Sequence, residues 1–98
     1  MTIEIVKLST DEDLICDVKE TTAEHIVVKN PVVIMIQQTE RGVGVALAPF
    51  MPYVTGDITI PRTAIVATGM PEEQLEQEYQ QRFGSGIVLS RTMPPNLA

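Results

Sequence analysis

Two side chains in this sequence could act as a nucleophile and its base: its only cysteine, Cys16, and its only histidine, His25. An imidazole that takes the proton of a thiol makes a nucleophilic pair. However, Cys16 lies in the segment ICDV, which is typical of a small core residue, and His25 opens an apolar run after a polar turn. A zinc site would need three or four such ligands. The sequence therefore predicts no catalytic residue, no metal site and no cofactor, and indicates that the chain is not an enzyme.

Two further segments resemble binding motifs, for calcium and for a dinucleotide, but do not have the required residues at the required positions. The segment DEDLICD, residues 11–17, is rich in carboxylates, but a calcium loop that began at Asp11 would require glycine at its sixth position and glutamate at its twelfth. Cys16 and Thr22 occupy these positions, which indicates a solvated turn. The segment GVG, residues 42–44, lacks the third glycine of a dinucleotide fingerprint and leads into a strand rather than a helix.

The charge of the chain limits how it can bind nucleic acid. Its net charge is −6 and its pI is near 4.5, whereas proteins that grip duplex DNA through phosphates usually present a basic face. The seven cationic residues are scattered: Lys7, Lys19, Lys29, Arg41, Arg62, Arg82 and Arg91. We therefore do not expect broad electrostatic binding of nucleic acid, and a local site around one or two arginines remains open.

The elements that must position these residues are short β-branched runs separated by turn residues, a pattern typical of a small barrel or sandwich. We expect strands at residues 3–8, 14–20, 25–36, 43–48 and 65–68, with extended chain at 57–60 and a polar hairpin loop at 37–42. Because Pro31 has no N–H group and pushes Asn30 out of the helical region, the third strand should bend there. The predicted fold is mostly β, a small, strongly bent antiparallel barrel of about five strands.

A single helix should follow the strands. Residues 70–84 place Pro71 at the first helical position and Gly84 at the end, and apolar residues recur at a spacing of four: Leu75, Tyr79 and Phe83. This stripe should dock on the barrel; the alternative is a helix that binds a partner. The domain boundaries we predict are a barrel at 1–69, the packed C-terminal helix at 70–84, and an extended tail at 85–98 in which GIVLS could add an edge strand.

Length and composition indicate one domain outside the membrane. Ninety-eight residues suit a single core, and no apolar run approaches the ~20 residues of a membrane span. The N-terminal segment MTIEIVKL lacks the features of a signal peptide, and one cysteine cannot form an internal disulfide, which agrees with a reducing compartment. We therefore expect a cytoplasmic protein.

The order of these signals resembles the Sm/LSm-like barrel family. Leu8, a polar turn and Cys16 fall at the spacing of the family's first motif, with Cys16 where the family prefers glycine. The segment ITIPRTAIV, residues 58–66, is similar to its second motif, with Pro61 and Arg62 where arginine and glycine would stand. Together with VKNPVV, LAPFMPY and the helix, the chain looks like a group of small acidic Sm-like proteins from marine phages of cyanobacteria, which implies the host cytoplasm during infection.

The resemblance implies a homo-oligomeric ring of five to seven subunits, formed by backbone pairing between edge strands, that binds single-stranded RNA or DNA at its inner rim. The residues that it suggests for this site are His25, which could stack on a base, Arg62 with its neighbour Thr63, and Lys29. The alternative is a structural or adaptor protein that binds another protein through the ring face or the C-terminal helix. The acidic charge favours this alternative, and the family resemblance favours the first.

Overall fold

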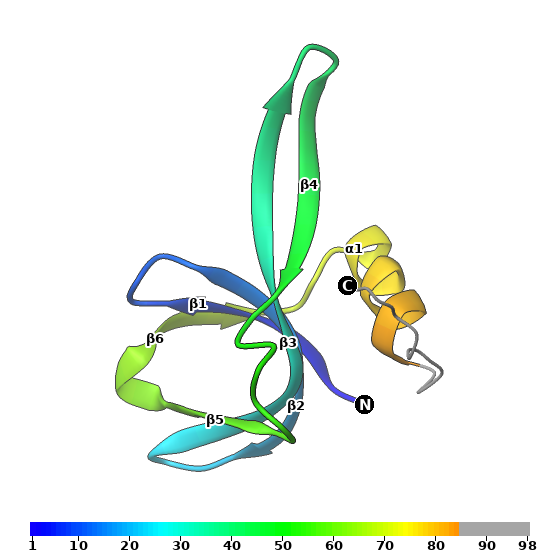
Figure 1. Cartoon of the computed structure of the whole chain (residues 1–98). Coiled ribbons are helices and arrows are strands. Elements are labelled where there is room, and N and C mark those ends of the chain that lie inside the picture. Colours follow the sequence, from blue (N-terminus) through cyan, green and yellow to red (C-terminus); the bar gives the residue numbers. More distant parts are fainter. Residues whose placement is uncertain (85–98) are drawn as a thin grey trace.

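The computed structural model describes residues 1–84, which form one antiparallel sheet of six strands followed by a short helix (Figure 1). The strands are β1 (Ile3–Leu8), β2 (Asp13–Thr21), β3 (His25–Thr39), β4 (Gly42–Pro49), β5 (Ile58–Pro61) and β6 (Ile65–Gly69). A 3₁₀ turn, η1 (Arg62–Ala64), joins β5 to β6, and the helix α1 (Glu73–Tyr79) continues into a π-helical turn, η2 (Gln80–Gly84). The predicted class, mostly β and antiparallel with one C-terminal helix, is confirmed.

The sheet is strongly curled because its longest strand pairs with three others. The strand order is β4-β3-β2-β1-β6, and β5 pairs with the first half of β3 while β4 pairs with the second half. Figure 1 shows that β5 and β4 consequently run in different directions away from the middle of β3. Within residues 1–84 the curl does not close, since β6 pairs only with β1, and β4 and β5 pair only with β3.

The predicted break in the third strand is a β-bulge. Ile15 pairs with Val32 and Asp17 pairs with Lys29, so β3 carries one residue more than β2 across this interval. Asn30 within it has a φ of 50°, in the left-handed region that asparagine tolerates better than most residues. A bulge bends a strand and increases its twist. The bend therefore lets the two halves of one strand serve two different neighbours.

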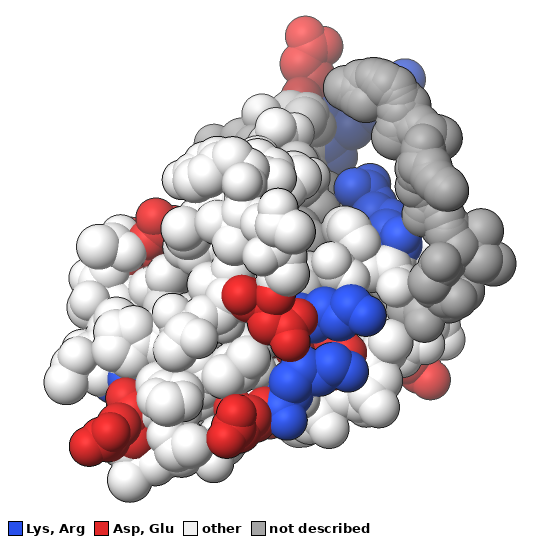
Figure 2. Space-filling model, turned by 60° about the horizontal axis from the view of Figure 1, so that its bottom comes forward, with Lys and Arg blue, Asp and Glu red and all other residues white. Residues whose placement is uncertain are grey.

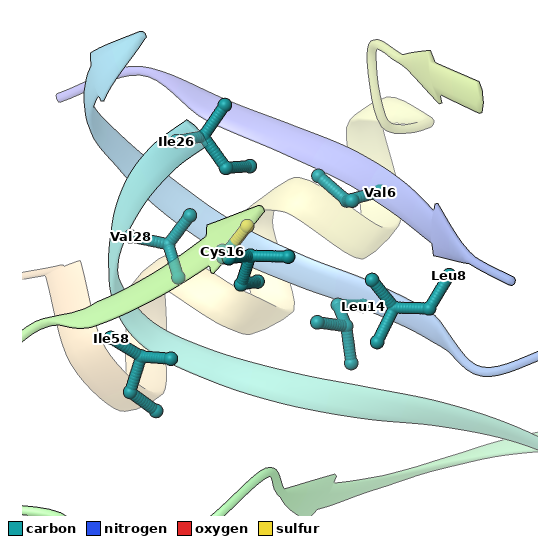
Figure 3. Packing of buried hydrophobic residues seen from close by; sticks show 8 residues of the cluster. Val6, Leu8, Leu14, Cys16, Ile26, Val28 and Ile58 are labelled. Atoms are coloured by element: carbon teal, nitrogen blue, oxygen red, sulfur yellow. The ribbon is translucent and has the colours of Figure 1, made fainter. Parts of the chain in front are cut away.

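The two faces of the sheet bury separate apolar clusters. The inner face, partly drawn in Figure 3, holds a cluster from β1, β2, β3 and β5: Val6, Leu8, Leu14, Cys16, Ile26, Val28, Ile58 and Ile60. The opposite face holds Ile3, Ile15, Val32 and Tyr79. Alternate residues of a strand point to opposite faces, so Ile15 belongs to one cluster while Leu14 and Cys16 belong to the other. The predicted role of Cys16 as a core residue is confirmed.

The helix docks on the outer cluster through its predicted stripe. Tyr79 is buried, and Leu75 and Phe83 pack against the same cluster. The start of the helix was predicted wrongly. Glu72 is the N-cap and is still extended, with ψ 146°, so the helix begins at Glu73, two residues after Pro71. Its α-helical part ends at Tyr79 and only the wider π-helical turn reaches Gly84.

The predicted polar loop at 37–42 is mostly strand. Gln37, Gln38 and Thr39 pair with the start of β4, and only Glu40 and Arg41 form the turn. The hairpin projects from the rest of the sheet (Figure 1), so both of its faces meet solvent near the tip. Polar residues there indicate exposure rather than loss of pairing, which is why composition alone suggested a loop.

The remaining differences are small. The segment 57–60, expected to be extended chain, falls largely in the paired strand β5, so the sheet has six strands rather than about five. The turn expected at PRTA is the 3₁₀ turn η1. The predicted tail at 85–98, with its edge strand, lies outside the described residues.

Candidate functional site

Three of the four predicted site residues meet at one corner of the sheet. His25, the first residue of β3, pairs with Pro61 at the end of β5. Arg62 follows directly, and its backbone N–H donates to the carbonyl oxygen of Glu24 at 2.9 Å. Thr63 is the next residue of the 3₁₀ turn, and Arg62 and Thr63 are both exposed. The β3–β5 pairing thus brings together residues nearly forty positions apart in the sequence.

The turn before β3 holds His25 in place through one side chain. The Thr22 hydroxyl lies 3.0 Å from the backbone N–H of His25 and 3.2 Å from that of Glu24, and accepts from both. It also lies 3.1 Å from the His25 carbonyl oxygen, to which it can donate. A threonine that bonds its own backbone in this way stabilises a tight turn. The start of β3 is therefore fixed locally as well as by β5.

Lys29 does not belong to this corner. It lies four residues along β3, where it pairs with Asp17 beside the bulge. Its carbonyl oxygen accepts a hydrogen bond from the Tyr79 hydroxyl at 3.1 Å. The structure thus places Lys29 next to the helix anchor, at the other end of the β3–β5 pairing from His25.

A pocket of about 430 Å³ adjoins the corner and includes Arg62. It opens between the ends of β2 and β3 and the strand β6, and its other polar residues are Glu4, Thr21 and Thr68. None of these three was singled out from the sequence. A signal for one of them was present: in the alternating segment IEIVKL, Glu4 shares its face with Val6 and Leu8, which both enter the inner cluster. A carboxylate among apolar residues of an inward-facing strand side indicates a polar opening in the core at that point.

Two cations of the described residues, Lys7 and Lys19, are held in ion pairs. Lys7 binds Asp13 at 3.0 Å and Asp11 at 3.3 Å, and these hydrogen bonds raise the pKa of Lys7. Lys19 binds the buried Asp17 at 3.2 Å. Arg62 and Lys29 form no ion pair with another residue of the described part of the chain. The face in Figure 2 shows acidic and basic groups side by side rather than a basic patch.

Cys16 is not poised for catalysis. Its thiol is buried and donates to the Glu4 carbonyl oxygen at 3.8 Å. Burial raises the pKa of Cys16 to about 12, and the charges of Glu4 and Asp17 add to this effect. The thiol therefore stays protonated at neutral pH, and the reactive form is the thiolate. Residues 1–84 contain no group of three or more potential metal-ligating side chains.

Comparison with known proteins does not add an identity: no protein-family model and no curated protein matches this chain. Among the residues that the structure describes, no helix has the length and apolar character needed to cross a membrane. The function must therefore be argued from the corner, the pocket and the free strand edges.

Proposed function

We propose that this chain is a self-assembling, Sm-like module that binds single-stranded nucleic acid at the corner formed by His25, Arg62 and Thr63. The observation that carries the proposal is the position of this corner beside β6, a strand with one edge that no other strand of residues 1–84 pairs with. Head-to-tail pairing of copies through that edge would repeat the corner around a ring. Several copies of one weak cationic site would then act together.

Exposed apolar side chains support assembly through the edges. Most of the large exposed apolar residues lie on the projecting β3–β4 hairpin or at β6: Met35, Ile36, Val43, Val45, Val66 and Met70. An unpaired strand edge is a template for another strand, and apolar residues on it favour such pairing over protection. The free edge of β4 in one copy and that of β6 in the next are the natural partners. A closed ring of five to seven subunits would satisfy both edges in every copy.

The chemistry of the corner fits single strands better than duplexes. A guanidinium can bind a phosphate or stack on a base, and an imidazole offers a second stacking surface. With a net charge of −6, long-range attraction to phosphates is absent, so affinity must come from local contacts to unpaired bases. Binding should therefore be weak for a duplex and stronger for short single strands.

Sedimentation velocity tests the assembly. The wild type should sediment as a closed oligomer at micromolar concentration, and Val66→Lys or Val45→Lys should shift it toward the monomer, because each places a charge at one of the two edges. Tyr53→Lys is the matched control, since Tyr53 is 81% exposed but lies on neither edge strand. A wild-type monomer at these concentrations would refute the ring.

Fluorescence anisotropy tests the nucleic-acid site. Labelled oligo-U, oligo-A and oligo-dT should bind the wild type at moderate salt, and Arg62→Ala should weaken binding at least tenfold. Arg41→Ala is the control, because Arg41 lies in the turn at the far end of the β3–β4 hairpin. Equal binding by the wild type and Arg62→Ala would remove Arg62 from the site.

The second candidate is an adaptor that binds another protein. The projecting hairpin favours it: Ile36, Val43 and Val45 expose 54–73% of their surface on an arm that the helix does not cover, in a strongly acidic chain. If the wild type is monomeric and binds none of the oligonucleotides, the adaptor function replaces the first.

A further inference from the structure

The pocket beside Arg62 contains two opposite charges that have no partner in the described part of the chain. The Glu4 carboxylate and the Arg62 guanidinium both belong to residues that line it, and neither forms an ion pair or side-chain hydrogen bond with another residue of 1–84. Arg62 is exposed and Glu4 is half-buried, so both charged groups are accessible to a molecule that enters the pocket. Two unpaired charges of opposite sign around one space suggest a ligand that meets both.

The position of Glu4 is enforced by the sheet. Glu4 pairs with Cys16 in the β1–β2 register and, by strand alternation, faces the same side as Val6 and Cys16 of the inner cluster. It is only half-buried because the curl is open at this end, between β2 and β6. Figure 3 shows Val6 and Ile26 near each other at one end of that cluster, and Ile26 is also part of the pocket wall. The pocket is thus the open mouth of the inner face.

The walls of the pocket offer both apolar surface and hydrogen-bonding groups. Ile26 and Ile65 give apolar surface, and Thr21 and Thr68 can each donate or accept a hydrogen bond. Small-molecule sites are typically ~300–1,000 Å³, largely apolar, with a few polar groups that fix orientation. A volume of about 430 Å³ falls at the small end of this range, which suits one mononucleotide rather than an extended strand.

We propose that this pocket binds one nucleotide whose base carries an amino group, with its phosphate on Arg62 and the amino group donating to Glu4. A carboxylate accepts from the amino group of cytosine. At the position of that amino group uracil presents a carbonyl oxygen, which cannot donate, so in the same pose two acceptors would face each other. The proposal rests on the proposed function only in sharing Arg62, and adds a base preference: cytosine over uracil.

The test is calorimetric titration of the full-length protein with cytidine monophosphate and uridine monophosphate. The wild type should bind the cytidine nucleotide about tenfold more tightly, a conservative value for one base-specific contact. In Glu4→Gln the ratio of the affinities for the cytidine and uridine nucleotides should be close to one, because an amide can donate to uracil as well as accept from cytosine. Since the ratio is measured within one variant, a change in its folded fraction does not alter it. Glu20→Gln, at an exposed position of β2 outside the pocket lining, should keep the wild-type ratio.

Arg62→Ala tests the other end of the ligand. This substitution should lower the affinity for cytidine monophosphate at least tenfold. It should leave the affinity for cytidine, which has no phosphate, unchanged. Equal affinity of the wild type for both nucleotides, a preference that survives Glu4→Gln, tighter binding of free amino acids than of nucleotides, or no heat at millimolar ligand would each overturn the proposal.

The outcomes separate this inference from the proposed function. If the protein is a monomer that binds no oligonucleotide but binds cytidine monophosphate more tightly than uridine monophosphate, the proposed pocket is supported and the proposed ring is refuted. If oligonucleotides bind in a way that depends on Arg62, but the two free nucleotides bind equally well, the proposed function is supported and the proposed nucleotide pocket is refuted.

Discussion

The contact between helix and sheet predicts the effect of removing a single oxygen atom, the hydroxyl of Tyr79. This hydroxyl lies 2.7 Å from the carbonyl oxygen of Asn30, inside the bulge, and 3.1 Å from that of Lys29, beside it. The ring is 1% exposed and lies 5.1 Å, centroid to centroid, from that of Phe83. Tyr79→Phe keeps the ring and leaves the two carbonyls without this donor.

The expected cost follows from the asymmetry of hydrogen bonds in folding. A formed bond contributes only about 1 kcal/mol net, but a buried acceptor left unpaired costs about 1–3 kcal/mol. Because Lys29 and Asn30 are not fully buried, water can partly replace the hydroxyl, and we expect Tyr79→Phe to lower the free energy of unfolding by about 1–2 kcal/mol. For a domain of this size that lowers Tm by about 5–15 °C. Tyr79→Ala also removes the ring and should cost about 3–5 kcal/mol.

Urea unfolding followed by far-UV circular dichroism measures both changes. The matched control is Tyr53→Phe, which makes the same chemical change at an exposed side chain and should leave the unfolding midpoint unchanged. If Tyr79→Phe and Tyr53→Phe have the same midpoint, the hydroxyl does not anchor the helix to the bulge. If only Tyr79→Ala is destabilised, packing alone holds the helix.

Three further predictions concern the helix stripe, the buried thiol of Cys16 and the bulge at Asn30. Leu75→Ala and Phe83→Ala should each lower the free energy of unfolding by about 1–3 kcal/mol. This is less than at a fully buried site, because both side chains are half-buried. An unchanged urea midpoint for both variants would show that the stripe does not pack on the sheet. Burial raises the pKa of Cys16 from about 9 to about 12, so the stability linked to its protonated thiol is fully present below pH 9. Between pH 9 and 12 the free energy of unfolding of the wild type should fall relative to that of Cys16→Ala by on the order of 1 kcal/mol per pH unit. Parallel plots of unfolding free energy against pH for the two proteins would refute this. Asn30→Gly should be nearly neutral and Asn30→Ala should cost about 1 kcal/mol, since the left-handed φ of 50° is free only for glycine; equal thermal midpoints for the two variants would argue against that conformation.

Most of the fold could be predicted from the sequence because its signals are local. β1 was placed at its observed bounds, and the start of β3 at His25 followed from the polar turn before an apolar run. The break at Asn30 and Pro31 was also local, since a missing N–H group and a restricted neighbour interrupt any ladder. The hairpin was predicted with too long a loop for the opposite reason: the pairing of Gln37 to Thr39 depends on the strand beside them, not on their own polarity.

The candidate site was only half visible for the same physical reason. Arg62 and His25 could be proposed because each differs in chemistry from its neighbours, and the pairing of β3 with β5 does bring them together. Glu4, Thr21 and Thr68 join Arg62 only through the curl of the whole sheet. No spacing along the chain encodes that arrangement. Lys29 illustrates the converse, because closeness to His25 in the sequence did not bring it to the corner.

The bulge links the helix to the candidate site. Because β3 bends at Asn30, its first half can pair with β5, and that pairing sets the position of Arg62 relative to His25. The bulge is held on one side by the Tyr79 hydroxyl and on the other by the backbone N–H of Phe50, which donates to the Pro31 carbonyl oxygen at 3.0 Å. A helix on the outer face therefore supports the strand geometry that the inner pocket requires. The helix is thus connected to the pocket only through the course of β3, because α1 contributes no residue to the pocket lining.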